Sequence, residues 1–199
     1  TYNVMLLAAL ETLYGNDFGL SAIPGFIKGG EYILHMVGPS CLPFNFGDSG
    51  SRMRLNTSLF WFARKTKNPA LLRNECKLLL EIPNYDYEQY RRMLPSIFVL
   101  GKDINLANLP KPKVDMFAAK NAAPVCLMRS SWKEDAIYVG IKGGKASANT
   151  HTHLDAGSFV MDAQGVRWAV DLGPQEYNSL ESKGIALWDN RANGQRWKV

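Results

Sequence analysis

The chain changes its hydrophobic period once, and that change divides it into a helical half and a strand half. Apolar residues first recur every three to four positions, as in Val4, Leu7 and Ala8, which is the period of an amphipathic helix. After the stretch LPKP at 109–112, where two prolines restrain the backbone, the period becomes two, as in a β-strand. We therefore predict a multidomain α+β chain, helical over 1–109 and strand-rich over 113–199.

In the helical half, capping and turn residues mark where helices begin and end. The first predicted helix runs to Tyr14 and ends at Gly15, because glycine adopts the left-handed conformation of a C-cap. The other predicted helices cover, in order, about 21–38, 57–66, 68–80 and 85–94. Between them, residues 44–52 (FNFGDSGSR) form a predicted long loop. Such a loop either carries function or only connects two helices.

In the second half, short runs of alternating residues predict strands at 123–128, 136–141, 158–162 and 166–170. The last two are joined by Asp162-Ala163-Gln164-Gly165, which we interpret as a hairpin turn with Gly165 at positive φ.

Composition narrows the class of protein. Of the 199 residues 46% are hydrophobic and 21% charged, as in a globular protein, and no apolar run reaches the ~18 residues of a membrane-spanning helix. The net charge of +5 suits an anionic partner, either nucleic acid or an acidic polysaccharide, or belongs to an ordinary basic domain. No nucleic-acid motif is present.

Cys41, Cys76 and Cys126 form no CxxC pair, and we expect free thiols. Both ends interrupt a pattern, so we expect a piece of a longer protein.

One segment, NTHTHLDAGSF at 149–159, concentrates chemically active side chains. Alternate residues of an extended backbone face the same side, so His151, His153 and Asp155 can project together. Imidazole and carboxylate groups in this arrangement suit zinc binding or proton transfer. Folding about the Gln164-Gly165 turn brings Asp171 near Gly157-Ser158, beside this segment. A polar surface strand is the alternative interpretation.

A third histidine, His35, has a different setting. It lies among Ile33, Leu34, Met36 and Val37 on a predicted helix, so we expect a hydrogen-bonded core or boundary histidine rather than a ligand.

The stretch HTHLDAGSFVMDAQGVRWAVDLG at 151–173 resembles the start of the β-sandwich domain of heparinase II/III-like polysaccharide lyases. The Gly143-Gly144 turn and Ser130-Ser131-Trp132 also fit this resemblance. The first half is similar to the last helices of the family's (α/α) toroid, and Thr1-Tyr2-Asn3 to the end of its catalytic tyrosine motif. The resemblance implies the C-terminal part of a toroid followed by the first strands of an antiparallel β-sandwich.

The resemblance also implies roles for individual residues. His151 corresponds to the catalytic histidine and Tyr2 to the catalytic tyrosine. His153 and Asp171 correspond to two ligands of a structural zinc ion, whose third ligand is expected beyond Val199. Asp155 either orients a histidine ring or makes a turn contact at the strand end.

The family's activity, carried over, is β-elimination on a uronic-acid-containing acidic polysaccharide of the heparin or heparan sulfate kind, in a secreted or periplasmic protein. Trp132, Tyr177 and Trp188 are candidates for stacking on sugar rings, or else core residues. Two alternatives stay open at this point. HxH patterns also occur in zinc-dependent hydrolases, and a non-catalytic carbohydrate-binding fragment would bind anionic glycan without turnover. The sequence decides neither the polymer nor the oligomeric state.

Overall fold

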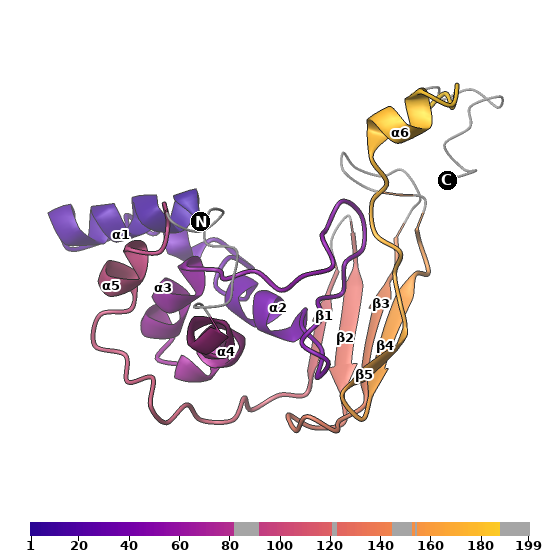
Figure 1. Cartoon of the computed structure of the whole chain (residues 1–199). Helices are drawn as coiled ribbons and strands as arrows, with labels where there is room; N and C mark the ends of the chain where they lie inside the picture. Colours follow the sequence, from indigo (N-terminus) through magenta and orange to yellow (C-terminus); the bar gives the residue numbers. More distant parts are fainter. Residues whose placement is uncertain (82–91, 121–122, 145–152, 154, 188–199) are drawn as a thin grey trace.

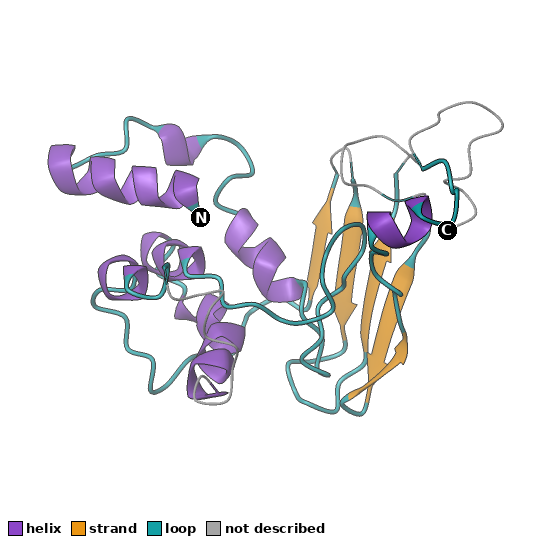
Figure 2. Cartoon of the chain, turned by 45° about the horizontal axis from the view of Figure 1, so that its top comes forward, coloured by secondary structure: helices purple, strands orange, loops and turns teal. Residues whose placement is uncertain are grey.

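The computed structural model describes residues 1–81, 92–120, 123–144, 153 and 155–187 (Figure 1). Its helical elements are α1 (Tyr2–Tyr14), the 3-10 helix η1 (Leu20–Ala22), α2 (Gly29–His35), α3 (Ser58–Lys65), the 3-10 helix η2 (Pro69–Leu72), α4 (Arg73–Glu81), α5 (Ser96–Leu100) and α6 (Tyr177–Glu181). The strands are β1 (Met116–Ala119), β2 (Val125–Arg129), β3 (Tyr138–Lys142), β4 (Phe159–Ala163) and β5 (Val166–Ala169). Figure 2 shows helices and sheet as two adjoining parts. None of the described helices has both the length and the hydropathy that a membrane crossing requires.

Most of the predicted helices are confirmed. Gly15 closes α1 in the left-handed conformation, with φ of 73°, and its N–H donates to the Glu11 carbonyl. The helix expected over 21–38 begins later than predicted. The chain first makes successive turns, with Gly25 at φ of 85°, and α2 begins only at Gly29. The helix predicted over 85–94 lies mainly outside the described residues, and α5 and α6 were not predicted.

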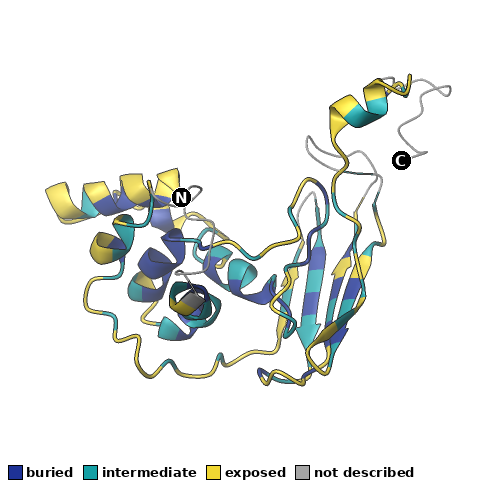
Figure 3. Cartoon of the chain, in the orientation of Figure 1, coloured by how far each residue is buried: buried dark blue, intermediate teal, exposed yellow. Residues whose placement is uncertain are grey.

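The helical core is built around α3. Its central side chains Leu59, Phe60 and Trp61 are almost completely buried, and helices α1, α2 and η2 contact this segment. The indole Nε1 of Trp61 donates to Glu11 Oε2 of α1 at 3.0 Å, so this buried donor is paired. Figure 3 shows α3 as the most deeply buried of the helices.

The strand half forms one antiparallel sheet in the order β1-β2-β3-β4-β5. The four predicted strands are confirmed to within two residues, and the short β1 was not predicted. Gln164 and Gly165 both have positive φ, 54° and 73°, as a two-residue hairpin turn requires. The α+β class is thereby confirmed, while the toroid, the sandwich and the division at 109–113 stay predictions.

Helix α2 and the chain that follows it pack against one face of the sheet. Phe44 lies in a second core with Leu127, Tyr138 and Val160, and Tyr32 and Met36 pack against it. A buried polar contact joins the same parts. Asp162 of β4 accepts hydrogen bonds from the Ser40 N–H at 3.1 Å and the Ser40 hydroxyl at 2.6 Å, and it pairs with Arg167 of β5. Residues 36–48 are therefore fixed against the sheet, and the last of them reach the candidate site.

Candidate functional site

The predicted histidine segment returns to the sheet through a turn at Asp155–Ser158. The Ser158 N–H donates to the Asp155 carbonyl at 3.0 Å, and Gly157 has φ of 92°. The Gly157 N–H donates to the Lys142 carbonyl at 2.8 Å, and the Lys142 N–H to the Ser158 carbonyl at 2.9 Å. This turn places Asp155 beside Lys142, the last residue of β3.

Asp155 and Lys142 form a buried ion pair. Lys142 Nζ lies 2.5 Å from Asp155 Oδ1, and their side chains are 3% and 11% exposed. The second carboxylate oxygen accepts the N–H of Gly47 at 3.2 Å. Both oxygens of Asp155 are thus engaged, one by β3 and one by the loop that the sequence marked at 44–52.

The same loop contacts His153. Its Nε2 lies 3.1 Å from Asp48 Oδ1, with the two side chains 36% and 32% exposed. The carboxylate that orients His153 is therefore that of Asp48. Of the two roles left open for Asp155, the described structure shows the turn contact: its carbonyl accepts the Ser158 N–H, and its carboxylate is engaged by Lys142 and Gly47.

Asp171 meets the loop through its backbone. The Asp171 carbonyl accepts a hydrogen bond from Asn45 Nδ2 at 3.1 Å, and Asn45 is only 3% exposed. The Asp171 carboxylate Oδ1 accepts the Gly173 N–H at 2.9 Å. The pairing of β4 with β5 shifts register between Met161 and Asp162, so the hairpin is not the regular one assumed from the sequence.

Residues 45–48, which we call the 45–48 loop, thus contact three predicted site positions, His153, Asp155 and Asp171. Sequence reasoning marked the loop by its composition but did not select Asn45, Gly47 or Asp48. The contacts span more than 100 residues of chain, and no local pattern reveals them.

Of the two residues predicted to transfer protons, the structure describes only Tyr2. His151 lies outside the described residues. Tyr2 is the first residue of α1 and is 69% exposed. The N-terminal end of α1 is the end nearer the sheet in both views (Figures 1 and 2). Within the described part of the chain, no hydrogen bond joins Tyr2 to His153 or Asp171, so its pairing with the histidine segment stays a prediction.

A zinc ion requires three or four ligands from His, Cys, Asp or Glu side chains. Within the ranges that the structure describes, no group of three such residues lies close enough to hold a metal. His153 pairs with Asp48, and Asp171 Oδ1 is taken by the Gly173 N–H. The predicted ligands His153 and Asp171 are therefore at most part of a site.

His35 is a core residue, as expected, but it is not hydrogen-bonded as expected. It is 1% exposed, and its ring meets that of Trp132 edge-on at 5.1 Å. Among the described residues neither ring nitrogen has a partner. Burial, reinforced by the nearby charge of Arg129, lowers the pKa of His35 to about 4. The ring is therefore neutral near pH 7 and packs as an aromatic side chain.

Comparisons with known proteins bear on the fold. No protein-family model matches the sequence, and no curated protein matches it. The structure is similar to that of heparan sulfate lyase HepC from Pedobacter heparinus, with 17% identity and a TM-score of 0.55. That similarity covers 92% of this chain and 26% of HepC. A crystal structure of heparinase III is similar at 18% identity and a TM-score of 0.44, covering 86% of this chain and 26% of that one.

The chain thus spans about a quarter of the length of the lyases that it resembles. At this identity the similarity to HepC establishes a common fold. The chain therefore has the fold of the corresponding part of a heparan sulfate lyase, and the resemblance to the heparinase-like family indicated by its histidine segment is confirmed at the level of the fold.

Proposed function

We propose that this chain is part of a polysaccharide lyase that cleaves a uronic-acid-containing acidic polysaccharide, of the heparin or heparan sulfate kind, by β-elimination. One observation carries the proposal. The 45–48 loop holds the histidine segment at one end of strands β3 and β4, through Asp48 to His153 and Gly47 to Asp155, in a chain whose fold is that of a heparan sulfate lyase. The net charge of +5 is the complement of such a substrate.

The reaction requires two proton transfers. A base removes the proton at C5 of the uronate, the electron pair forms the C4–C5 double bond, and the C4–O bond breaks. An acid then protonates the departing oxygen of the neighbouring sugar. Histidine titrates near neutral pH and suits the base, and tyrosine, with an ordinary pKa of about 10, suits the acid. We assign this pair to His151 and Tyr2, without fixing which residue takes which role.

The described contacts have a positioning role in this scheme. His151 is two residues before His153 and four before Asp155, and both of those residues are held by the 45–48 loop. In this proposal the two contacts serve to place the segment that carries the catalytic histidine. General acid–base catalysis depends on such placement, because the group must lie within hydrogen-bond reach of the proton.

Zinc bound by His153 and Asp171, with a further ligand outside the described residues, is part of the proposal. Elimination needs no metal-bound hydroxide, so a closed structural site would suffice, and no step above passes through the metal. A secreted or periplasmic location is also part of the proposal, since the polymer substrates do not cross membranes.

The test uses the longest protein that contains this chain, incubated with a panel of acidic polysaccharides. We expect ultraviolet absorbance from unsaturated uronate to rise on at least one of them. His151→Ala and Tyr2→Phe should each lower the rate by about 10²- to 10⁴-fold, the usual contribution of one acid–base group. Tyr14→Phe is the matched control for Tyr2→Phe, because Tyr14 is also exposed and lies on the same helix.

Two results would contradict the proposal. Reducing ends released without the absorbance would indicate hydrolysis, and a His151→Ala variant as active as the parent would remove the assigned histidine. Metal analysis of His153→Ala tests the zinc site separately, since loss of bound zinc is expected whether or not a substrate has been found.

A further inference from the structure

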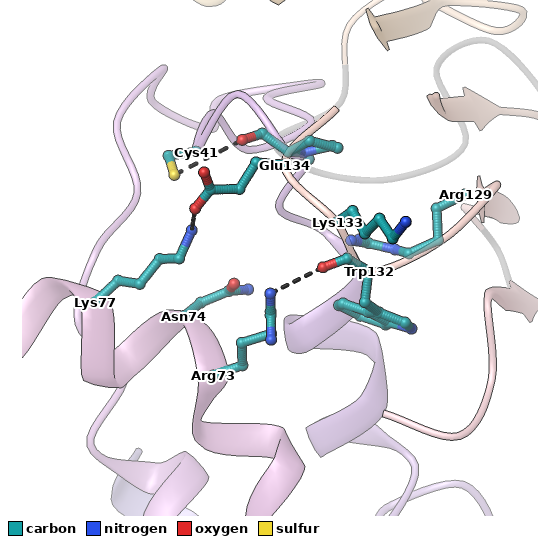
Figure 4. Close-up of a pocket in the computed structure, with 10 residues that line it drawn as sticks. Cys41, Arg73, Asn74, Lys77, Arg129, Trp132, Lys133 and Glu134 are labelled. Carbon is teal, nitrogen blue, oxygen red and sulfur yellow. Dashed lines mark hydrogen bonds and ion pairs between the residues drawn. The ribbon is translucent and has the colours of Figure 1, made fainter. Parts of the chain in front are cut away.

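A basic pocket lies between α4 and the connection from β2 to β3 (Figure 4). It is a small hollow that is open to solvent on one side. Its walls come from α4, from the turn at 38–41 and from the β2–β3 connection. Four cationic side chains and one carboxylate line it: Arg73, Lys77, Arg129, Lys133 and Glu134.

Two guanidinium groups in this pocket are held in place by neutral partners. Arg73 Nη2 donates to the Trp132 carbonyl at 2.8 Å. The guanidinium of Arg129 stacks over the Trp132 ring at 3.7 Å, and its Nη2 donates to the Val37 carbonyl at 2.8 Å. Each guanidinium has five N–H donors in a planar fork, so these bonds fix the orientation and leave donors for a ligand.

The two arginines repel each other. Burial is the main cause that lowers the pKa of Arg129 to about 10; the charge of Arg73 acts in the same direction, and Tyr138, Asp115 and Asp162 act against it. Arg129 Nε is buried and has no hydrogen-bond acceptor among the residues with described positions. A bound anion would relieve the repulsion between the two guanidinium groups.

The lysines differ in their partners. Lys77 Nζ lies 3.2 Å from Glu134, whose side chain is 82% exposed, so this pair is screened by water. Lys133 is exposed, and no carboxylate pairs with its ammonium within the described part of the chain. Lys133 is therefore the cation most able to turn toward an incoming anion.

The pocket is separate from the candidate catalytic site along the sheet. Strand β3 runs from Tyr138 to Lys142, and Arg129 pairs with Tyr138 at its first residue. Lys142, at the last residue of β3, contacts Asp155. The pocket and the histidine segment thus lie at opposite ends of one strand.

We propose that this pocket binds an oxyanion group, sulfate or carboxylate, of an acidic polysaccharide and anchors the polymer at a second point. Planar guanidinium forks and an ammonium group match the geometry and charge of such groups. The claim that the oxyanion belongs to a polysaccharide rests on the proposed function. The claim that the pocket recognises an oxyanion rests on the pocket alone.

The test is calorimetric titration of the longest protein that contains this chain, at constant ionic strength, with sodium sulfate, with a short sulfated uronic-acid oligosaccharide and with its desulfated form. We expect the sulfate ion and at least one oligosaccharide to bind. Lys133→Glu should weaken each interaction about tenfold, by removing one charge-assisted contact and adding repulsion. Lys102→Glu makes the same change at an exposed lysine outside the pocket and should leave affinity within about twofold.

Each other outcome overturns the inference. No binding of any probe would show that the pocket takes no anion. Equal weakening by Lys133→Glu and Lys102→Glu would show attraction by net charge only. Loss of binding in His153→Ala would move the anion to the histidine segment. Binding of sulfate ion without either oligosaccharide would exclude the polysaccharide as carrier. None of these binding results depends on lyase activity. The absorbance assay tests the proposed function separately, so its failure can be distinguished from failure of the pocket to bind an anion.

Discussion

Replacing Asp155 with alanine would leave a buried ammonium group without its counter-charge. Lys142 is 3% exposed in its side chain, and Asp155 is the carboxylate that it contacts, at 2.5 Å. After Asp155→Ala the contact that remains in the described structure is the ring of Phe46, 5.8 Å from Nζ. The N–H of Gly47 would lose its acceptor as well.

The expected magnitude follows from burial. Removing one partner of a buried ion pair costs about 3–5 kcal/mol, because the other charge stays desolvated and unpaired. An exposed pair of the same kind contributes about 0–1 kcal/mol. Lys77 and Glu134 form such a pair at 3.2 Å, with side chains 36% and 82% exposed. Lys77→Met is therefore the matched control, and it should change the free energy of unfolding by less than about 1 kcal/mol.

The assay is urea unfolding followed by circular dichroism at pH 7, with hydrogen exchange of the Gly47 amide as a local readout. Asp155→Ala should lower the free energy of unfolding and speed exchange at Gly47. The double variant Asp155→Ala/Lys142→Met should regain part of the loss, because it removes the stranded charge. A loss below about 1 kcal/mol in Asp155→Ala, or a double variant no better than the single one, would refute this account.

Two further predictions concern the helical half and its contact with the sheet. In Gly38→Ala the new Cβ would overlap the carboxylate of Asp162, so we expect a loss of about 1–3 kcal/mol by thermal unfolding. Gly143→Ala, whose Cβ would make an ordinary contact, should be nearly neutral. Burial raises the pKa of Glu75 from 4.5 to about 8. The folded state then keeps a proton that the unfolded chain has lost, so this residue's contribution to stability falls as the pH rises from about 4.5 to about 8. Glu75→Gln should flatten that fall by up to roughly 1.4 kcal/mol per pH unit, and identical urea midpoints for both proteins across the range would contradict it.

Much of the fold was predictable because its signals are local. Gly15 ends α1, and Gly165 shapes the hairpin between β4 and β5, at positive φ in both places. Of the four strands found by alternation, β2, β3 and β4 alternate between buried and more exposed residues, and β5 alternates between exposed and half-buried ones. The exceptions were short elements. Strand β1 has four residues and helices α5 and α6 have five each, too few for a period to stand out.

The candidate site was predictable only in part. The pattern of His151, His153 and Asp155 identified the segment, and the composition of 44–52 identified a loop. The contact between Asp48 and His153 could not be predicted from the sequence, because 105 residues separate them. Sequence gives the residue types at such a contact but not the pairing.

The sequence by itself determined the order of helices and strands and the segment in which the chemically active side chains gather, because period and turn residues act over a few positions. Tertiary structure decided which charges are buried and what they meet. Nothing in the sequence distinguishes Lys142 from a surface lysine or Glu75 from a surface glutamate. Both residues are nevertheless buried in the structure. Burial depends on the whole chain folding around a group, and the free energy of a charge depends on that burial far more than on its neighbours in sequence.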